Sequence, residues 1–328
     1  MKDISEKDKE ILYQLDLNSR KPLKSIAKKV NLPENTLRYR IKKLEESNII
    51  TRYYTVINSY NLGYNVIKFY AKYININSTI KKEIIEFFTH MPTTWVVGST
   101  EGKFDIGVIF WMKNINDFYP IWKEIFCKYP NNFIDTILFF QCEALSLRPT
   151  YLINTTKRSE NEYYDITRQN RMVTIDAIDS RILEVLACDA KIPTVQLAKK
   201  LKISTGLVNN RIKKLKKNGI IQSYRIEINA SKIGYINIKA DIFLTNLNEI
   251  PKVISYFKQC PHVLCIMKSV GYSHIEIEFN VKTVTQFHQI MTEFIDQHPN
   301  LINKYNYFQT EISHKLSWIP AMKQIKKR

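Results

Sequence analysis

Hydrophobic residues in the first sixty positions recur at the spacing of helices. Ile11, Leu12 and Leu15 share one helical face, and a second short segment runs over residues 22–30. A third segment carries Leu37, Ile41 and Leu44. Residues three and four apart lie on the same side of an α-helix, so these positions mark buried faces. A β-prone run follows at residues 49–54. The pattern predicts three helices and a short β wing.

A different pattern begins near residue 65. Strand-like runs at 66–76, 94–100, 104–112 and 133–146 alternate with amphipathic segments at 79–90 and 115–129. The second amphipathic segment has an apolar stripe of Ile115, Phe118, Ile121, Trp122 and Ile125, which is typical of a core-facing helix. The order β-α-β-β-α-β predicts a ferredoxin-like unit.

The whole succession of patterns occurs twice. Residues 8–64 align without a gap with residues 179–235 at an offset of 171, and Arg40–Leu44 and Arg211–Leu215 carry the same Arg-Ile-Lys-Lys-Leu. The offset becomes 169 from Pro92 and Pro261 onward, and 168 at Gln141 and Gln309. Such internal similarity indicates a duplicated architecture.

The duplication predicts an α+β fold with two tandem copies, each a winged helix-turn-helix followed by a ferredoxin-like (βαββαβ) domain. Copy one has its winged helix-turn-helix at 1–64 and its ferredoxin-like domain at 65–150. Copy two has the same pair at 172–235 and 236–320. Residues 151–171 are polar and patternless, and they are interpreted as the linker.

The positive charge is concentrated in the two helix-turn-helix segments. The net charge of the chain is +18. Residues 1–64 hold 13 Lys and Arg against 8 Asp and Glu, and residues 172–235 hold 12 against 5. The ferredoxin-like segments are close to neutral, with 9 against 8 in copy one and 7 against 7 in copy two. Two basic modules that alternate with two neutral ones indicate a polyanionic partner such as double-stranded DNA.

Several classes of protein are not indicated. No apolar run approaches the roughly 18 residues of a membrane span, and the first residues have no secretion-signal pattern, so we expect a cytoplasmic protein without membrane contact. The five cysteines form no CxxC pair, which argues against a zinc site or a disulfide framework. We find no Gly-rich phosphate loop, catalytic triad or metal cluster, and we expect no enzyme activity and no cofactor.

Taken together, these motifs resemble the Lrp/AsnC family, also called feast/famine regulatory proteins. The resemblance covers about residues 4–147 and 175–320. It is carried in copy one by Ile26-Ala27, by the pattern Leu37-x-x-Arg40-Ile41-x-x-Leu44 with Ile49-Ile50, by Leu62-Gly63-Tyr64, and by the segment Thr100 to Asp105. Copy two repeats most of these elements.

The resemblance implies a transcriptional regulator whose ferredoxin-like halves sense a ligand, often an amino acid, and pair with each other. Family members usually carry one copy per chain and dimerise, so the two copies here are expected to form an intramolecular pseudo-dimer, with higher homo-oligomers left open. The effector site is expected near the loops that carry Ser99, Thr100, Gly102, Asp105, Gly271 and His274.

Those loops also have a purely structural interpretation. A tight turn between adjacent strands would by itself explain both glycines. His274 stands where copy one has Asp105, so the two loops do not offer the same charge. Either one pocket alone binds ligand, or His274 and Asp105 meet across the pseudo-dimer.

The DNA contacts are expected on the third helix of each copy. With the aliphatic face buried, a turn of 100° per residue directs the remaining side chains outward or to the flank. Asn suits adenine and Arg suits guanine, whereas the lysines and Arg40 are better placed for phosphates. The alternative for Arg40 and Arg211 is an ion pair with a neighbouring acid. The predicted DNA-binding residues are Asn35, Thr36, Arg38, Tyr39, Arg40, Lys42, Lys43, Thr205, Asn209, Asn210, Arg211, Lys213 and Lys214. Because the two sets differ, we expect an imperfect palindrome as the operator.

Two other functions are compatible with this architecture. Siroheme decarboxylases are similar in domain arrangement, but their Cys-Tyr-x-Arg and Trp-Pro-Tyr-Asn stretches are missing at residues 91–98 and 260–267. An architectural protein that coats DNA without sensing a ligand would keep the basic modules and use the ferredoxin-like halves for assembly.

Overall fold

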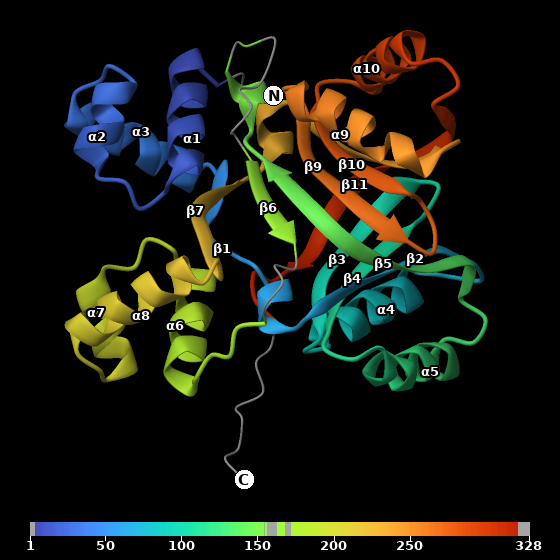
Figure 1. The fold of residues 1–328 in the computed structure, drawn as a ribbon, viewed down its shortest axis with the longest axis horizontal. Coiled ribbons are helices and arrows are strands. Elements are labelled where there is room, and N and C mark those ends of the chain that lie inside the picture. The colour runs from blue at the N-terminus through green and yellow to red at the C-terminus, as the bar shows by residue number, and fades with distance from the viewer. Residues whose placement is uncertain (1–3, 154, 156–162, 168–171, 321–328) are drawn as a thin grey trace.

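The computed structural model describes residues 4–153, 155, 163–167 and 172–320. Figure 1 shows a helical group from each copy on one side of the molecule and a large sheet, covered by further helices, on the other. The mixed helix and strand content of two tandem copies agrees with the predicted α+β fold.

The two helical groups are helix-turn-helix domains with matching elements. Copy one contributes α1 (Glu6–Leu17), α2 (Leu23–Lys29) and α3 (Glu34–Glu46), and copy two contributes α6 (Ala177–Cys188), α7 (Thr194–Leu201) and α8 (Thr205–Lys217). Ser5 caps α1 by accepting a hydrogen bond from the Asp8 backbone N–H, and Asp176 with Asp179 forms a capping box on α6. Such caps satisfy backbone donors that a helix start leaves free.

The β-prone runs after the third helices pair with each other and not within their own domain. Strands β1 (Ile50–Ile57) and β7 (Ile221–Ile228) form an antiparallel two-stranded ribbon that joins copy one to copy two. The loops after α1 and α6 add matching bonds to it, from Ser19 N–H to the Tyr224 carbonyl (2.9 Å) and from Ala190 N–H to the Tyr53 carbonyl (3.0 Å). The ribbon therefore fixes the two helical groups relative to one another.

Each helix-turn-helix core includes residues of the other copy. Ile226, Ile233 and Tyr235 of copy two pack into the core of α1–α3. Ile57 of copy one packs into the core of α6–α8 in the same way. Separating the copies would expose these apolar side chains to water, so the burial of hydrophobic surface holds the pair together.

The ferredoxin-like domains have the predicted element order. Copy one contains β2 (Asn65–Tyr73), α4 (Ser78–His90), β3 (Thr94–Gly102), β4 (Ile106–Met112), α5 (Phe118–Lys128) and β5 (Phe133–Leu147). Copy two contains β8 (Ile236–Leu244), α9 (Ile250–Gln259), β9 (Val263–Val270), β10 (Ile275–Val281), α10 (Val284–Gln297) and β11 (Ile302–Leu316). Short 3₁₀ turns lie at Tyr60–Leu62, Ile115–Asp117, Thr150–Leu152, Ala230–Ile233 and Leu247–Glu249.

The two ferredoxin-like sheets join at both edges into one nine-stranded sheet. Its order is β2-β4-β3-β11-β8-β10-β9-β5-β6, and an additional pairing of β2 with β5 closes it into a barrel. The joints between copies are β3 with β11 and β5 with β9. The two copies therefore pair within one chain, as the resemblance implied.

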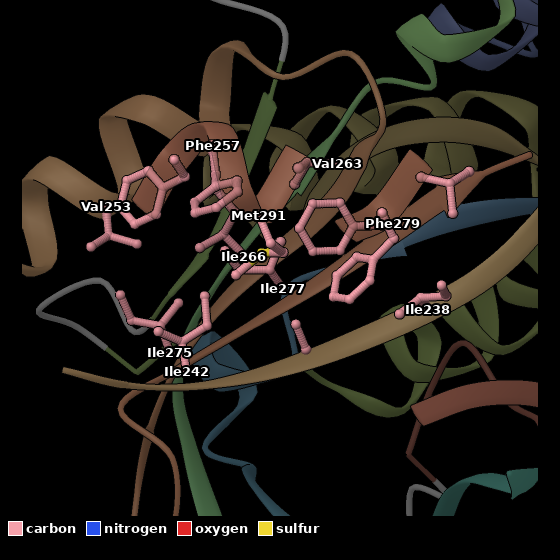
Figure 2. Close-up of a cluster of buried hydrophobic side chains, with 14 of the residues drawn as sticks. Ile238, Ile242, Val253, Phe257, Val263, Ile266, Ile275, Ile277, Phe279 and Met291 are labelled. Carbon is pink, nitrogen blue, oxygen red and sulfur yellow. The ribbon is translucent and has the colours of Figure 1, made fainter. Parts of the chain in front are cut away.

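The helices cover the outer face of the barrel, and the core lies beneath them. In copy two, Ile238, Ile242, Ile277 and Phe279 of the sheet pack against Phe257 and other apolar residues of α9 and α10, as Figure 2 shows. The apolar stripe predicted for copy one also faces the core. Phe118 and Ile125 are buried, and Ile121 and Trp122 pack at the border of the core. Ile115 lies before α5 and is exposed.

The predicted linker contains ordered structure. Strand β6 (Tyr163–Thr167) pairs antiparallel with the end of β5, and Tyr151 and Leu152 are buried in the core of the first helix-turn-helix domain. Residues 154, 156–162 and 168–171 of the predicted linker lie outside the described residues. The polar composition of this stretch concealed a short edge strand.

Candidate nucleic-acid interface

The third helix of each helix-turn-helix buries one aliphatic face. On α3 the buried residues are Leu37, Ile41 and Leu44, and on α8 they are Val208, Ile212 and Leu215. Asn48 and Gly219 then turn the chain with positive φ angles of 55° and 66°. Both residue types tolerate this left-handed conformation, which ends the helix and starts the ribbon.

The opposite faces are open to solvent, as predicted. Of the predicted contact residues, Asn35, Arg38, Tyr39, Lys42 and Lys43 of α3 and Asn209, Asn210, Lys213 and Lys214 of α8 are exposed. Thr36 and Thr205, in the first turns of these helices, are half-buried. The exposed set contains amide, guanidinium and ammonium groups, which are the groups that contact base edges and phosphates in DNA.

The two flanking arginines hold the third helix against the first helix. Arg40 donates to Asp8 Oδ1 at 2.9 Å and to Ser5 Oγ at 3.2 Å. Arg211 lies 2.5 Å from Asp176 Oδ2 and 3.4 Å from Asp179. The Asp179 backbone N–H and Arg211 lower the pKa of the Asp176 carboxyl. These contacts are the ion pairs that the sequence left as the alternative, and phosphate binding by Arg40 or Arg211 stays a prediction.

The two exposed faces differ in charge. Helix α8 carries five cationic side chains and no acidic one, whereas α3 carries four cationic and three acidic ones. On α3, Arg38 is paired with Glu34 at 2.5 Å and Lys42 with Glu46 at 3.6 Å. The residue of copy two that corresponds to Glu34 is Thr205. The electrostatic attraction for a polyanion is therefore stronger at α8.

Residues outside the predicted set fix the angle between the two domains. Arg20 donates to the Ala190 carbonyl at 2.8 Å, and the equivalent Lys191 lies 3.5 Å from Glu45 and 3.9 Å from the ring centre of Tyr53. Nothing in the sequence except their shared position in the repeat distinguished Arg20 and Lys191. Lys191 joins α3 to copy two, and Arg20 joins the loop after α1 to the loop after α6, so the two recognition faces are presented as one unit.

The predicted effector residues take part in hydrogen bonds of the barrel. Asp105 Oδ2 accepts from the Tyr73 N–H at 2.8 Å, and His274 Nδ1 accepts from the Leu244 N–H at 2.9 Å. Tyr73 and Leu244 are equivalent in the repeat. Asp105 and His274 therefore do the same thing in their own copies, which is to accept a hydrogen bond from the backbone N–H at the end of a strand. Each side chain is thus bonded within its own copy, and the hypothesis that Asp105 and His274 meet across the pseudo-dimer stays a prediction.

The other predicted effector residues lie where the copies meet. Gly102 and Gly271 have φ angles of 120° and 106°, and a Cβ on either would lie 3.3–3.4 Å from the neighbouring strand of the other copy. Ser99 Oγ is 2.8 Å from His314 Nε2 of copy two, and Thr100 donates to the Phe104 carbonyl at 2.8 Å. Turn geometry and close packing require both glycines, whatever else the loops do.

One open cavity borders this group of residues. It has a volume of about 400 Å³ and is lined by Ser78, Lys81, Lys82, Ile85, Glu86 and His314. It therefore lies between α4 of copy one and β11 of copy two. Burial lowers the pKa of His314, which keeps its imidazole neutral and able to accept or donate a hydrogen bond.

No other chemistry is apparent in the described part of the chain. Within it, no group of three or more His, Cys, Asp or Glu is placed to hold a metal ion. None of the helices there is both long enough and apolar enough to cross a bilayer.

Comparisons with known proteins agree with this geometry. A family model described as winged helix-turn-helix DNA-binding matches residues 4–51 and 175–222. An uncharacterised HTH-type transcriptional regulator of Pyrococcus furiosus is 33% identical over 118 residues, which are 34% of this chain and 72% of that protein. Regulatory protein AsnC of Haemophilus influenzae is 28% identical over 143 residues, which are 43% of this chain and 93% of AsnC.

A solved structure shares the fold of the whole tandem chain. The siroheme decarboxylase NirDL matches 95% of this chain and 93% of its own with a TM-score of 0.62, but at 15% identity. At that identity the likeness concerns the arrangement of domains alone. The sequence relatives are regulators of roughly half this length, and their motifs occur here twice. The chain is thus a member of the Lrp/AsnC family of helix-turn-helix transcriptional regulators, with two copies of the family's architecture in one polypeptide.

Proposed function

We propose that the chain binds DNA sequence-specifically as a pseudo-dimer and reads two different half-sites, one with α3 and one with α8. The observation that carries this proposal is that two exposed, cationic recognition faces with different side chains are held in one fixed pair. Copy one offers Asn35 and Arg38 to base edges, and copy two offers Asn209 and Asn210. Different side chains at the groove discriminate different bases.

Selection of bound fragments from genomic DNA tests this proposal. We expect an imperfect palindrome, with one half-site bound more tightly because α8 carries no acidic side chain. Two identical half-sites would contradict the proposal, and binding without any sequence preference would favour the architectural alternative.

A pair of variants then assigns the half-sites. Asn35→Ala with Arg38→Ala is expected to relax specificity in one half-site, and Asn209→Ala with Asn210→Ala in the other, with about 1–3 kcal/mol lost per base contact. The measurement is a titration of each variant with operators in which one half-site at a time is scrambled. A uniform loss over both half-sites in either variant would refute the assignment.

We further propose that a small effector such as an amino acid regulates this binding from the cavity between α4 and β11. Lys81 and Lys82 suit a carboxylate, and His314 and Ser78 supply hydrogen-bonding groups. The repeat places Ser146 where copy two has His314, and Ser146 is engaged by Arg225 at 2.8 Å. Only one such site per chain is therefore expected.

Thermal shift across the amino acids, followed by calorimetric titration of any hit, tests the effector proposal. A ligand at 100 times its Kd stabilises the folded state by about 2.7 kcal/mol. We expect one site per chain, lost in His314→Ala and kept in His288→Ala. Two equivalent sites, or binding unaffected by His314→Ala, would contradict the assignment.

Catalysis is not part of this proposal. Incubation with siroheme is expected to leave its absorption spectrum unchanged, because the decarboxylase motifs are missing at residues 91–98 and 260–267. A spectral change that depends on the protein would support the enzyme alternative.

A further inference from the structure

The interior of the closed barrel contains charged side chains from both copies. Lys68 of β2 lies 2.9 and 3.0 Å from the two carboxylate oxygens of Glu276 on β10. Lys239 of β8 forms an ion pair with the same carboxylate and donates to the Tyr70 hydroxyl. All three charged side chains have an exposed fraction of 4% or less. Glu276 therefore bridges one lysine from each copy.

A second carboxyl lies beside this bridge. Asp241 stands directly opposite Glu276 in the register of β8 and β10 and is fully buried. Its two oxygens have no hydrogen-bond partner among the described residues. Two lysines and two carboxyls make the formal charge of this barrel cluster zero.

Another buried ion pair joins the copies near the ribbon. Arg225 of β7 donates to Asp16 of α1, at 2.9 Å from Nε to Oδ1 and 2.8 Å from Nη2 to Oδ2. The side chains of Arg225 and Asp16 are 8% and 2% exposed. Arg225 also donates to Ser146 Oγ at 2.8 Å and to the Leu147 carbonyl at 3.2 Å.

These charges occupy positions that are not equivalent in the two copies. Lys68 and Lys239 correspond, but Glu276 corresponds to Gly107, and Asp241 corresponds to Tyr70. A Cβ on Gly107 would lie 2.7 Å from Cε1 of Tyr70, so the Tyr70 ring fills the space that a side chain at 107 would need. In the second pair, Asp16 corresponds to Ala187 and Arg225 corresponds to Tyr54.

We propose that the two clusters make the interface selective for the pairing of copy one with copy two, against pairing of two identical copies. Two copies of copy one would bury two Lys68 side chains with Gly107 and Tyr70 in place of the carboxylates, and would place Asp16 against Tyr54. Two copies of copy two would bury four carboxyls with two lysines, and would place Arg225 against Ala187. A buried charge without a partner is strongly unfavourable, so both identical pairings are penalised at the barrel cluster. The Arg225 cluster penalises mainly the pairing of two copies of copy two, because Asp16 keeps Arg148 of its own copy at 3.7 Å.

The selectivity has a consequence for assembly. One copy of a chain cannot pair with the identical copy of a second chain without leaving buried charges unpaired. The same charges disfavour mixed pairing with a regulator that lacks Glu276 or Arg225 at the equivalent positions. One α3 and one α8 are therefore always presented together, whichever DNA sequence they bind.

Native mass spectrometry of a nicked chain tests this selectivity. A protease site is inserted between residues 156 and 162 of the full chain, and the purified protein is cleaved, unfolded in urea and refolded. The two halves differ in mass, so each pairing gives its own peak. We expect the mixed pair alone, and the statistical 1:2:1 distribution would overturn the proposal.

A neutral variant provides the comparison. It carries Lys68→Met, Lys239→Met, Asp241→Asn, Glu276→Gln, Asp16→Leu and Arg225→Met. In this variant we expect identical pairs to be detected beside the mixed pair, with the distribution shifted toward the statistical 1:2:1. The matched control, Lys7→Gln with Glu10→Gln, neutralises a partly exposed ion pair on α1 and should still give the mixed pair alone. Selectivity that survives in the neutral variant would show that the charges do not cause it.

Urea unfolding of the uncut chain decides the matter if the nicked halves do not refold. Glu276→Gln should raise the unfolded-to-folded ratio at least roughly 100-fold, because it leaves Lys68 and Lys239 buried without their carboxylate. Adding Lys68→Met to Glu276→Gln should recover part of that loss. A change below about threefold for Glu276→Gln, similar to that of the Lys7 and Glu10 control, would overturn the proposal.

Discussion

Substitution of Asp16 by Ala is expected to destabilise the chain far more than its single lost carboxylate suggests. The change leaves the guanidinium of Arg225 in a site where the side chain is 8% exposed. Burial opposes the charged form of Arg225, and Asp16 outweighs that effect and raises the pKa of Arg225. Without Asp16 the charge stays buried and loses three hydrogen bonds of 2.8, 2.9 and 3.1 Å.

The magnitude follows from comparing this pair with an exposed one. Removing one partner of a buried ion pair costs about 3–5 kcal/mol. Arg38 and Glu34 on α3 also form an ion pair, but their side chains are 58% and 36% exposed. An exposed pair at this spacing is worth about 0.3–0.5 kcal/mol. Asp16→Ala should therefore lower the free energy of unfolding several times more than Glu34→Ala.

Urea unfolding followed by circular dichroism measures both values. The double variant Asp16→Leu with Arg225→Met removes the charge of Arg225 and should recover part of the stability. Arg148, which lies 3.7 Å from the Asp16 carboxylate in the native chain, still lacks that partner. Equal effects of Asp16→Ala and Glu34→Ala would refute the reasoning, as would a double variant no more stable than Asp16→Ala.

Three further results are expected. Burial raises the pKa of Asp241 from an ordinary 3.8 to about 7, although Lys239 acts in the opposite direction. Between these two pKa values the carboxyl is protonated in the folded chain and ionised in the unfolded chain. The free energy of unfolding therefore falls through this group as the pH rises from about 4 to 7. Asp241→Asn should accordingly stabilise the chain by about 1–4 kcal/mol more at pH 8 than at pH 4, and an equal effect at both pH values would exclude the mechanism. Leu37→Ala should cost about 2–5 kcal/mol in thermal or urea unfolding, because the side chain is fully buried beneath α3, and a cost below 1 kcal/mol would contradict that packing. The variant His274→Asp should keep a hydrogen-bond acceptor for the Leu244 N–H, as Asp105 does for the Tyr73 N–H. It should therefore lose less unfolding free energy than His274→Leu. A larger loss in His274→Asp would show that the imidazole is needed for another reason.

The local elements were predictable because periodicity records which face of each element is buried. The strand predicted at 133–146 is observed as Phe133–Leu147, and the helix predicted at 79–90 is observed as Ser78–His90. The duplication also showed that each ferredoxin-like unit had a second unit to pair with. Pairing of copies therefore followed from the repeat together with the family resemblance.

The contacts between copies were not predictable in the same way. The run at 49–54 is β-prone in any partner arrangement, so the sequence could not show that β1 pairs with β7 and not within its own domain. Lys68 and Glu276 are 208 residues apart, and neither lies in a local motif. Only the fold brings them to one interior.

The candidate site was predictable in part. Burial of three aliphatic positions on each recognition helix determines which side chains face outward, and the exposed set matches the prediction for Asn35, Arg38, Tyr39, Lys42 and Lys43. The partner of Arg40 depends on how α3 packs on α1, which periodicity does not encode. The repeat showed that Asp105 and His274 are equivalent in position, but their shared role became apparent only through their hydrogen bonds to the Tyr73 and Leu244 N–H groups.

The salt dependence of DNA binding tests the central claim, which is that the outward faces of α3 and α8 bind the duplex. Affinity for a selected operator is measured by fluorescence anisotropy over a range of salt concentrations, for the native chain and for Lys42→Ala with Lys213→Ala and Lys214→Ala. Each lost phosphate contact lowers the slope of log K against log salt by about 0.9, so the slope should fall by two to three in magnitude. A control with three exposed lysines of the ferredoxin-like domains replaced, Lys82, Lys123 and Lys252, should keep the native slope. An unchanged slope in the first variant, or an equal fall in the control, would contradict the claim.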